Sequence, residues 1–294
     1  MAESRTLDLG GEVHVMDHGG SGQPILLIHG LGGSHVNWSA VADPLAELGA
    51  VSAIDLIGFG RTPPDGRTAK IDEQVALVIR YLAATYDSPA ILVGNSMGGL
   101  VSMLVAQEAP ELVRSLILVD PALPMIRPVF DLGVAKALVA PLIPAFGRKR
   151  AELAASDPER YVEEAFSLVC ADPSRVAESD REKAVAMARE RAEMPWVAAS
   201  FGQAASSLFA VISNRIRFTR GLKSIEADAI VVHGDKDRLV HIASARWLCR
   251  SVRPDWTLVT FDGVGHTPQM ETPDRFLDAV RCCLLYTSPS PRDS

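Results

Sequence analysis

The sequence has few cysteines and no excess of positive charge, and each absence excludes a class of protein. Only 4 of the 294 residues are Cys, and none stands in a C-x-x-C or similar metal-ligand spacing. This excludes a disulfide framework, so we expect reduced thiols and no metal site. Lys and Arg number 29 against 36 Asp and Glu, a formal net charge of −7 at pH 7. Nucleic-acid binders usually present a basic face, so no nucleic-acid partner is expected.

Long uninterrupted apolar segments are also missing. The longest, residues 129–146, is broken by Asp131, Lys136, Pro141 and Pro144, which makes it a poor membrane span and a better apolar lid. The N-terminal segment lacks the apolar core of a signal peptide. We therefore expect a cytoplasmic protein with no stable membrane insertion. The sequence leaves the oligomeric state open.

The composition is that of a folded protein with an atypical tail. Hydrophobic residues make up 48% and charged residues 22%, and a chain of this length can bury a large core. Residues 283–294 resemble a translated sequencing adapter. We therefore expect the natural chain to end near Cys282 and leave the tail out of the fold prediction. The alternative is a genuine disordered tail rich in Pro and Ser.

Short strand-like segments alternate with segments of helical periodicity along most of the chain. The expected strands are residues 5–9, 12–17, 24–28, 51–54, 90–93, 115–119, 229–232 and 257–261. The expected helices are residues 38–48, 72–86, 97–108, 242–252 and the segment from 273 onward. Asp72 is a candidate N-cap of the second helix. This alternation predicts an α/β protein with a mostly parallel sheet and helices on both faces.

The alternation stops after the sixth expected strand. Residues 125–221 have helical periodicity and no convincing strand, which predicts a helical cap inserted into the α/β core. The expected domains are therefore a core of residues 1–124 and 222–282, a cap of 125–221, and the tail. Apolar cap residues such as Trp196, Phe201 and Phe209 could line a substrate pocket or simply pack the cap onto the core.

The clearest chemical motif is Gly94-Asn-Ser96-Met-Gly98, which follows an apolar strand and opens an apolar helix. This is the context of a G-x-S-x-G nucleophile elbow, in which the tight turn requires small neighbours and lifts the serine above the sheet. The plainer alternative is a glycine-rich turn with an N-capping serine. The strand and helix around the motif favour Ser96 as a nucleophile.

A serine nucleophile needs a base, and the base needs a group that orients it. His266 follows the last expected strand, at the same end of the sheet as the elbow. Asp237, in the loop after the seventh strand, is the preferred orienting acid, and the order Ser-Asp-His fits the motif. Asp120 is the second choice, and Asp235 comes too early in its turn. His29 and His233 each end a strand before a glycine, so structural roles are expected for them.

Acyl transfer also needs donors for the oxyanion. The N–H of Met97, directly after the nucleophile, is one candidate. The other is the N–H of Leu31 in the loop His29-Gly-Leu-Gly-Gly33, where glycines allow close approach of the backbone to a substrate.

Taken together, these motifs resemble the α/β-hydrolase fold superfamily. The matching segments are His29-Gly-Leu-Gly32, Asp55-Leu-Ile-Gly-Phe-Gly-Arg-Thr62, the Ser96 elbow, the Asp237 turn and Gly265-His266. The resemblance covers nearly the whole chain and implies an eight-stranded, mostly parallel sheet, a helical cap and a serine hydrolase without cofactor. Epoxide hydrolases and haloalkane dehalogenases of this fold carry Asp at the elbow, so Ser96 argues against those activities.

Within the superfamily, we expect a lipase-like carboxylesterase acting on small to medium, largely apolar esters through an acyl-enzyme. The sequence of the nucleophile elbow also resembles that of carbon–carbon hydrolases of aromatic meta-cleavage products. Those generally carry Trp after the catalytic His, where this chain has Thr267, and a Pro in the oxyanion loop, which this chain lacks. A cofactor-free perhydrolase and a non-catalytic ligand-binding member remain further alternatives.

Overall fold

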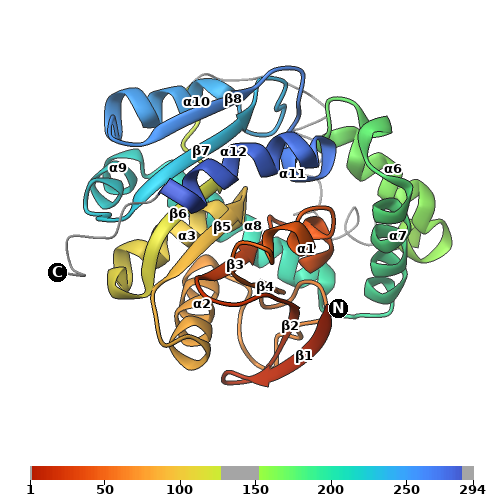
Figure 1. Ribbon diagram of the computed structural model, residues 1–294. Helices are drawn as coiled ribbons and strands as arrows, with labels where there is room; N and C mark the ends of the chain where they lie inside the picture. Colours follow the sequence, from red (N-terminus) through yellow and green to blue (C-terminus); the bar gives the residue numbers. More distant parts are fainter. Residues whose placement is uncertain (1, 127–151, 287–294) are drawn as a thin grey trace.

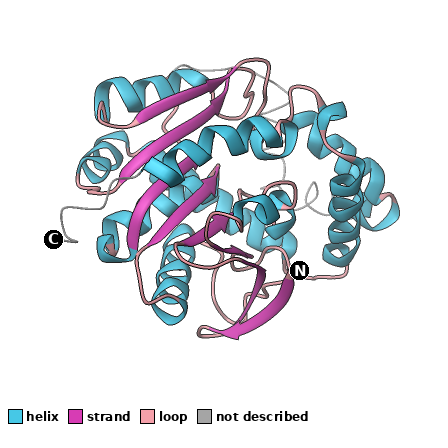
Figure 2. Ribbon diagram, in the orientation of Figure 1, coloured by secondary structure: helices cyan, strands magenta, loops and turns pink. Residues whose placement is uncertain are grey.

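The computed structural model describes residues 2–126 and 152–286. Eight strands form one sheet in the order β1-β2-β4-β3-β5-β6-β7-β8 (Figures 1 and 2). β1 and β2 form an antiparallel hairpin, β2 pairs antiparallel with β4, and all later pairings are parallel. The strands are Glu3–Asp8, Glu12–Gly19, Pro24–Ile28, Ala50–Ile54, Ala90–Asn95, Val113–Val119, Asp228–Gly234 and Thr257–Phe261.

Helices cover both faces of this sheet, because successive strand side chains point to opposite faces and both sets are apolar. In β3, Leu26 and Ile28 join the core cluster shared with α2, α3 and α10. Ile25 and Leu27 join a second cluster with α1 and α12. These helices span Ile71–Thr85 (α2), Met97–Glu108 (α3), Ile242–Trp247 (α10), Ala42–Leu45 (α1) and Pro273–Tyr286 (α12). A π-helical turn, Leu248–Val252, continues α10.

Between β6 and β7 the described residues form helices and no strand, as expected for the segment predicted to be a cap. The longer helices are Pro158–Val169 (α6), Glu178–Ala192 (α7), Val197–Ser213 (α8) and Arg215–Lys223 (α9), and a 3-10 turn, Pro173–Arg175, follows α6. α6 and α7 lie at the edge of the molecule, coloured green in Figure 1, while α8 packs on α2 and α9 on α3. The predicted lid at 129–146 lies outside the described residues, and the domain limits stay predictions.

Two details of the expected helices are wrong. Residues 38–48 are not one helix but a 3-10 turn, His35–Trp38, followed by α1. Pro44 lies in α1, and proline is tolerated only in the first turn of a helix, so a continuous helix through it is disfavoured. Asp72 is not an N-cap, because α2 begins at Ile71 with Lys70 as its N-cap. Asp72 instead lies in the first turn, where its charge complements the helix dipole.

The structure also contains a short helix that periodicity did not predict, α11 at Pro268–Glu271, directly after His266. Among the described residues, no single helix has the length and hydropathy of a membrane span, although the bent pair α7 and α8 meets both criteria jointly.

Candidate active site

Ser96 occupies a strained turn between β5 and α3. Its φ of 56° and ψ of −115° lie outside the regions that side chains with a Cβ favour. A Cβ on Gly98 would come within 2.1 Å of the Ile28 carbonyl oxygen, so only glycine allows α3 to approach β3 this closely. Ser96 holds the N-cap position of α3, yet its side chain makes no capping hydrogen bond. The capping role considered for Ser96 is therefore not the one its hydroxyl performs.

His266 and Asp237 are paired beneath the surface. Nδ1 of His266 lies 2.7 Å from Oδ2 of Asp237, and both side chains are buried. The other carboxylate oxygen of Asp237 accepts hydrogen bonds from the N–H groups of Leu239 and Val240, at 2.7 and 3.0 Å. Burial alone would raise the pKa of Asp237, but the neighbouring His266 holds it below its usual value. Asp237 is thus an ionised acceptor that fixes the orientation of the imidazole.

A hydrogen-bond bridge ties the His266 loop to the elbow. The amide Nδ2 of Asn95, the residue before Ser96, donates to the backbone oxygens of His266 and Val119 at 3.0 and 3.1 Å. The N–H of Ser96 in turn donates to the Val119 oxygen at 2.9 Å. The structure therefore pairs two residues of the predicted triad, His266 and Asp237, and bonds the His266 loop to the residue before Ser96. The triad role of Ser96 stays a prediction.

Glu271 anchors the His266 loop to the segment after α6, a feature that sequence reasoning missed. Its buried carboxylate accepts hydrogen bonds from the N–H groups of Gly265, Ala171 and Asp172, at 2.8, 3.0 and 3.0 Å. The N–H of His266 donates to the Val169 oxygen at 2.6 Å. The position of the candidate base thus depends on residues from the helical insertion, and no local motif around Glu271 indicates this contact.

The predicted oxyanion loop lies against the elbow. A Cβ on Gly30 would lie 3.1 Å from the Ser96 Cβ, and the Gly33 N–H closes a turn onto the Gly30 oxygen at 3.0 Å, with Leu31 inside the turn. Met97 is the first residue of α3, where backbone N–H groups have no partner within the helix. Nη1 of Arg191 in α7 donates to the Gly32 oxygen at 2.6 Å. The roles of the Leu31 and Met97 amides as oxyanion donors remain predictions.

The two histidines that end strands have structural contacts. Nδ1 of His29 lies 2.7 Å from the Gly30 oxygen, and Nε2 accepts from the Leu56 N–H at 3.1 Å. Burial lowers the pKa of His29 to about 4, so its ring is neutral at pH 7. Nε2 of His233 lies 2.8 Å from the Val240 oxygen, and burial also lowers the pKa of this ring.

Asp235 and Asp120, the alternatives to Asp237 as the acid that orients His266, lie in different surroundings. Asp235 accepts from the Gly263 N–H at 2.6 Å and pairs with Lys236 at 3.2 Å, so it is used within its own turn. Asp120 is fully buried, and its Oδ1 accepts from the Gly234 N–H at 2.9 Å. Asp120 lies beside the His266–Asp237 pair, since one carboxylate oxygen of each acid and one imidazole nitrogen lie within 4.8 Å of one another.

A second cluster of histidine and carboxylate lies in the Asp55–Thr62 motif. Oδ2 of the buried Asp55 is 2.8 Å from Nδ1 of His14, 2.9 Å from Nδ1 of His35 and 2.9 Å from the donating N–H of Arg61. Although these residue types also bind metals, three hydrogen-bond partners already surround this single oxygen. The hydrogen bonds hold the pKa of Asp55 far below its usual value despite burial. The cluster thus fixes the turn beside the oxyanion loop.

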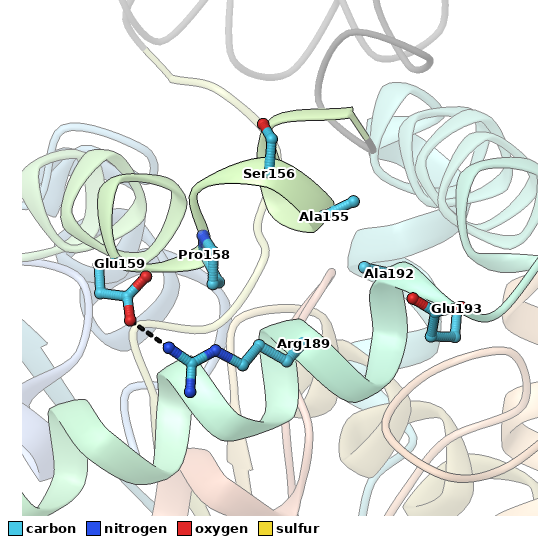
Figure 3. A pocket seen from close by; sticks show the side chains of 7 residues that line it. All are labelled: Ala155, Ser156, Pro158, Glu159, Arg189, Ala192 and Glu193. Carbon is cyan, nitrogen blue, oxygen red and sulfur yellow. Dashed lines mark hydrogen bonds and ion pairs between the residues drawn. The ribbon is translucent and has the colours of Figure 1, made fainter.

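Figure 3 shows a hollow within the helical insertion, between the start of α6 and the end of α7. Its volume is about 400 Å³, and Arg189 forms an ion pair with Glu159 across it. A second hollow of about 590 Å³ lies between the segment after α6 and the loop of Lys236 and Arg238. Ser96 and His266 are not among the lining residues of either hollow.

Residues 23–273 match the family described as alpha/beta hydrolase fold, and the chain belongs to that family. The fold predicted from the sequence is thus confirmed. Lipase 1 of Psychrobacter immobilis is 28% identical over 280 residues, covering 94% of this chain and 81% of the lipase. The 2-hydroxy-6-oxo-6-phenylhexa-2,4-dienoate hydrolase structure from Rhodococcus sp. shares the fold, with a TM-score of 0.77 at 24% identity, covering 97% of this chain and 99% of that one.

Two further relatives are longer than this chain. The dihydrolipoyllysine-residue acetyltransferase components of the acetoin cleaving systems of Cupriavidus necator and Pseudomonas putida are 39% identical over 103 residues and 28% identical over 273 residues. These matches cover 35% and 92% of this chain, but only 28% and 64% of the two relatives.

Proposed function

We propose that the protein is a serine carboxylesterase that cleaves small to medium, largely apolar esters through an acyl-enzyme. The observation that carries this proposal is the pairing of His266 with Asp237 at 2.7 Å, in a loop whose His266 oxygen accepts from the residue before Ser96. Ser96 itself is held at φ 56°. The similarity to Lipase 1 of Psychrobacter immobilis supports ester hydrolysis. Phe201 supports an apolar substrate, because its ring lies 3.2 Å from the Cβ position of Gly32 in the oxyanion loop.

In this mechanism, Ser96 Oγ attacks the ester carbonyl while His266 takes its proton. The N–H groups of Leu31 and Met97 stabilise the negative oxygen of the tetrahedral intermediate. The intermediate collapses, His266 gives its proton to the leaving alcohol, and the acyl group stays on Ser96. Water, deprotonated by His266, then attacks the acyl-enzyme. The bond from the acyl carbon to Ser96 Oγ breaks, His266 returns the proton to Oγ, and the carboxylic acid leaves. Asp237 orients the imidazole and stabilises its charged form in both steps.

Replacing Ser96 with Ala tests this proposal. We expect hydrolysis of p-nitrophenyl butyrate to fall by about 10³-fold or more, because no nucleophile remains while the oxyanion donors stay in place. Ser102→Ala, a buried serine of α3 that donates to the Gly98 oxygen, is the matched control and should retain turnover. Labelling with a fluorophosphonate should require Ser96. Turnover by Ser96→Ala at the wild-type rate would exclude the assignment.

A substrate panel separates this function from the carbon–carbon alternative. We expect p-nitrophenyl esters of short and medium chain length to be hydrolysed with higher kcat/KM than a meta-cleavage dienoate. Thr267 supports this expectation, because it follows His266 where the carbon–carbon hydrolases generally have Trp. A preference for the dienoate would replace the esterase proposal with that alternative.

A further inference from the structure

Besides Glu271, two buried carboxyl groups, Asp120 and Asp237, lie at the candidate site among the described residues, and the proposed mechanism uses only Asp237. Asp120 directly follows β6 and has no exposed surface. Its φ of 42° is a left-handed conformation that is strained for a residue other than glycine. Oδ1 accepts from the Gly234 N–H, whereas Oδ2 is buried with no hydrogen-bond partner. The fold therefore holds this side chain in a strained position with one oxygen unused.

The unused group lies next to the candidate base. Asp120 and Asp237 follow β6 and β7, which are neighbouring parallel strands, so both carboxyl groups reach the same edge of the sheet. Oxygens of both acids and a ring nitrogen of His266 lie within 4.8 Å of one another. Nε2 of His233 lies 3.5 Å from Oδ1 of Asp120 and 3.5 Å from Oδ2 of Asp237.

Two carboxyl groups this close cannot both ionise without strong repulsion. The charge of Asp237 is stabilised by His266 and by two backbone N–H groups, whereas Asp120 accepts from only one. Burial, and then the charge of Asp237, raises the pKa of Asp120 well above its usual value, with a smaller contribution from Glu271. A proton on Asp120 also gives the pair of acids a shared hydrogen bond, because a protonated carboxyl group of Asp120 can donate to the ionised carboxylate of Asp237.

We propose that Asp120 is a reserve acid of this site, a neutral carboxyl group that ionises and orients His266 when Asp237 is lost. The inference rests on the proposed function, because it requires His266 to be the base. In the intact protein, Asp120 keeps the pair of acids at a single negative charge. When Asp237 becomes neutral, the repulsion disappears, and Asp120 releases its proton to solvent and accepts from His266. Asp120 is therefore a positioning residue.

A set of three variants tests this inference. Loss of the acid can lower the kcat of a serine triad by roughly 10⁴-fold. We expect a smaller fall in kcat for Asp237→Asn. Adding Asp120→Asn should lower kcat by at least a further ~10-fold, since no acid then orients the base. Adding Asp235→Asn instead is the matched control and should cause no further loss, because Asp235 binds Gly263 and Lys236. Equal rates for Asp237→Asn and Asp237→Asn/Asp120→Asn would overturn the inference.

The pH profile distinguishes orientation from a structural effect. Only ionised Asp120 can orient His266, so the residual activity of Asp237→Asn should fall as acid protonates Asp120. Asp237, the main charged neighbour of Asp120, is replaced in these variants. The other groups facing Asp120 are His233, His266 and Glu271, and all three remain in every variant. The double variant should lack this dependence. A profile of the same shape in both variants would contradict the assignment.

An infrared measurement keeps the inference testable if Asp237→Asn does not fold. The wild-type protein at pH 7 should show the C=O stretching band of a protonated carboxyl group, absent in Asp120→Asn and present in Asp235→Asn. Absence of the band from the wild-type protein would refute a neutral Asp120. The Ser96→Ala assay separates the two proposals. If Ser96→Ala is active, the proposed function is wrong. If Ser96→Ala is inactive but Asp237→Asn and Asp237→Asn/Asp120→Asn have the same kcat, only the proposal for Asp120 is wrong.

Discussion

His29 illustrates how a single side chain can serve the fold through its neutral form. Its two ring nitrogens contact the Gly30 oxygen and the Leu56 N–H, one as donor and one as acceptor, and the ring has no exposed surface. A second proton would leave the acceptor nitrogen unable to bind Leu56. Because Gly30 opens the oxyanion loop, the neutral ring connects that loop to the segment after β4.

This contact predicts a pH-dependent stability. The pKa of His29 is lowered from 6.5 to about 4 in the folded protein, so the unfolded chain binds more protons between these values. The stabilisation is therefore complete above pH 6.5 and is lost as the pH falls towards 4, by an amount of about 3 kcal/mol.

Urea unfolding at several pH values should show this loss in the wild-type protein. In His29→Gln, the loss between pH 6.5 and 4 should be smaller, although the variant is less stable at pH 7. The pKa of Asp55 is also lowered. The stability that Asp55 contributes is therefore lost at lower pH, below the usual pKa range of a carboxyl group. If the free energy of unfolding fell equally with pH between 6.5 and 4 in the wild-type protein and in His29→Gln, the assignment would be contradicted.

At the scale of elements, the candidate base is held by a short helix rather than by the sheet. α11 places Glu271 under the His266 loop, where it accepts from backbone groups on both sides of the contact between core and insertion. Arg175 adds a contact from Nη1 to Oε1 at 3.3 Å. A buried carboxylate with several donors is costly to change, because each donor loses its partner.

Glu271→Gln should therefore lower both stability and activity. Glutamine has one acceptor oxygen, and its amide group would face N–H donors, so we expect a loss of about 1–3 kcal/mol in the free energy of unfolding. Because Gly265 precedes His266, kcat should fall as well. Glu163→Gln, on the exposed face of α6, is the control and should change neither quantity. A Glu271→Gln variant with wild-type stability and kcat would show that the contact is dispensable.

At the scale of the whole molecule, the helical insertion completes elements of the core. The Ile71 N–H at the start of α2 donates to Oγ of Ser207 in α8 at 3.0 Å, and the Ala69 N–H donates to Oε1 of Gln203 at 2.9 Å. The first N–H groups of a helix have no partner of their own, so α8 supplies a capping function from 136 residues further along the chain. An exposed ion pair, Arg61 with Glu190, links the same parts, and such pairs contribute little to stability.

Ser207→Ala should reduce the free energy of unfolding by about 1 kcal/mol, the usual cost of losing a helix cap. Ser206→Ala is a matched control, because Ser206 is exposed and donates only to the Gln203 oxygen in its own helix. Chemical denaturation of both variants provides the measurement. Equal stability of the two variants would mean that α8 does not cap α2.

Local patterns predicted most of the fold. The apolar segment of β3, the elbow around Ser96 and α3 were found at or near their observed limits, because each depends on side-chain periodicity or on turn chemistry. Pro44 and the first turn of α2 were misread, since helix ends depend on single residues and on distant partners. The roles of Glu271 and Ser207 were not predicted, because their partners lie far away in the sequence.

The sequence by itself determined the family and the candidate residues Ser96, Asp237 and His266, because the elbow and the strand-end loops are encoded by neighbouring residues. Only the tertiary structure decided which of the acids meets His266, and that Asp120 lies beside this pair in strained, buried form. Both acids end neighbouring parallel strands, so spacing along the chain cannot rank them. Their relative positions follow from the packing of loops at one edge of the sheet, which joins residues that are far apart in sequence.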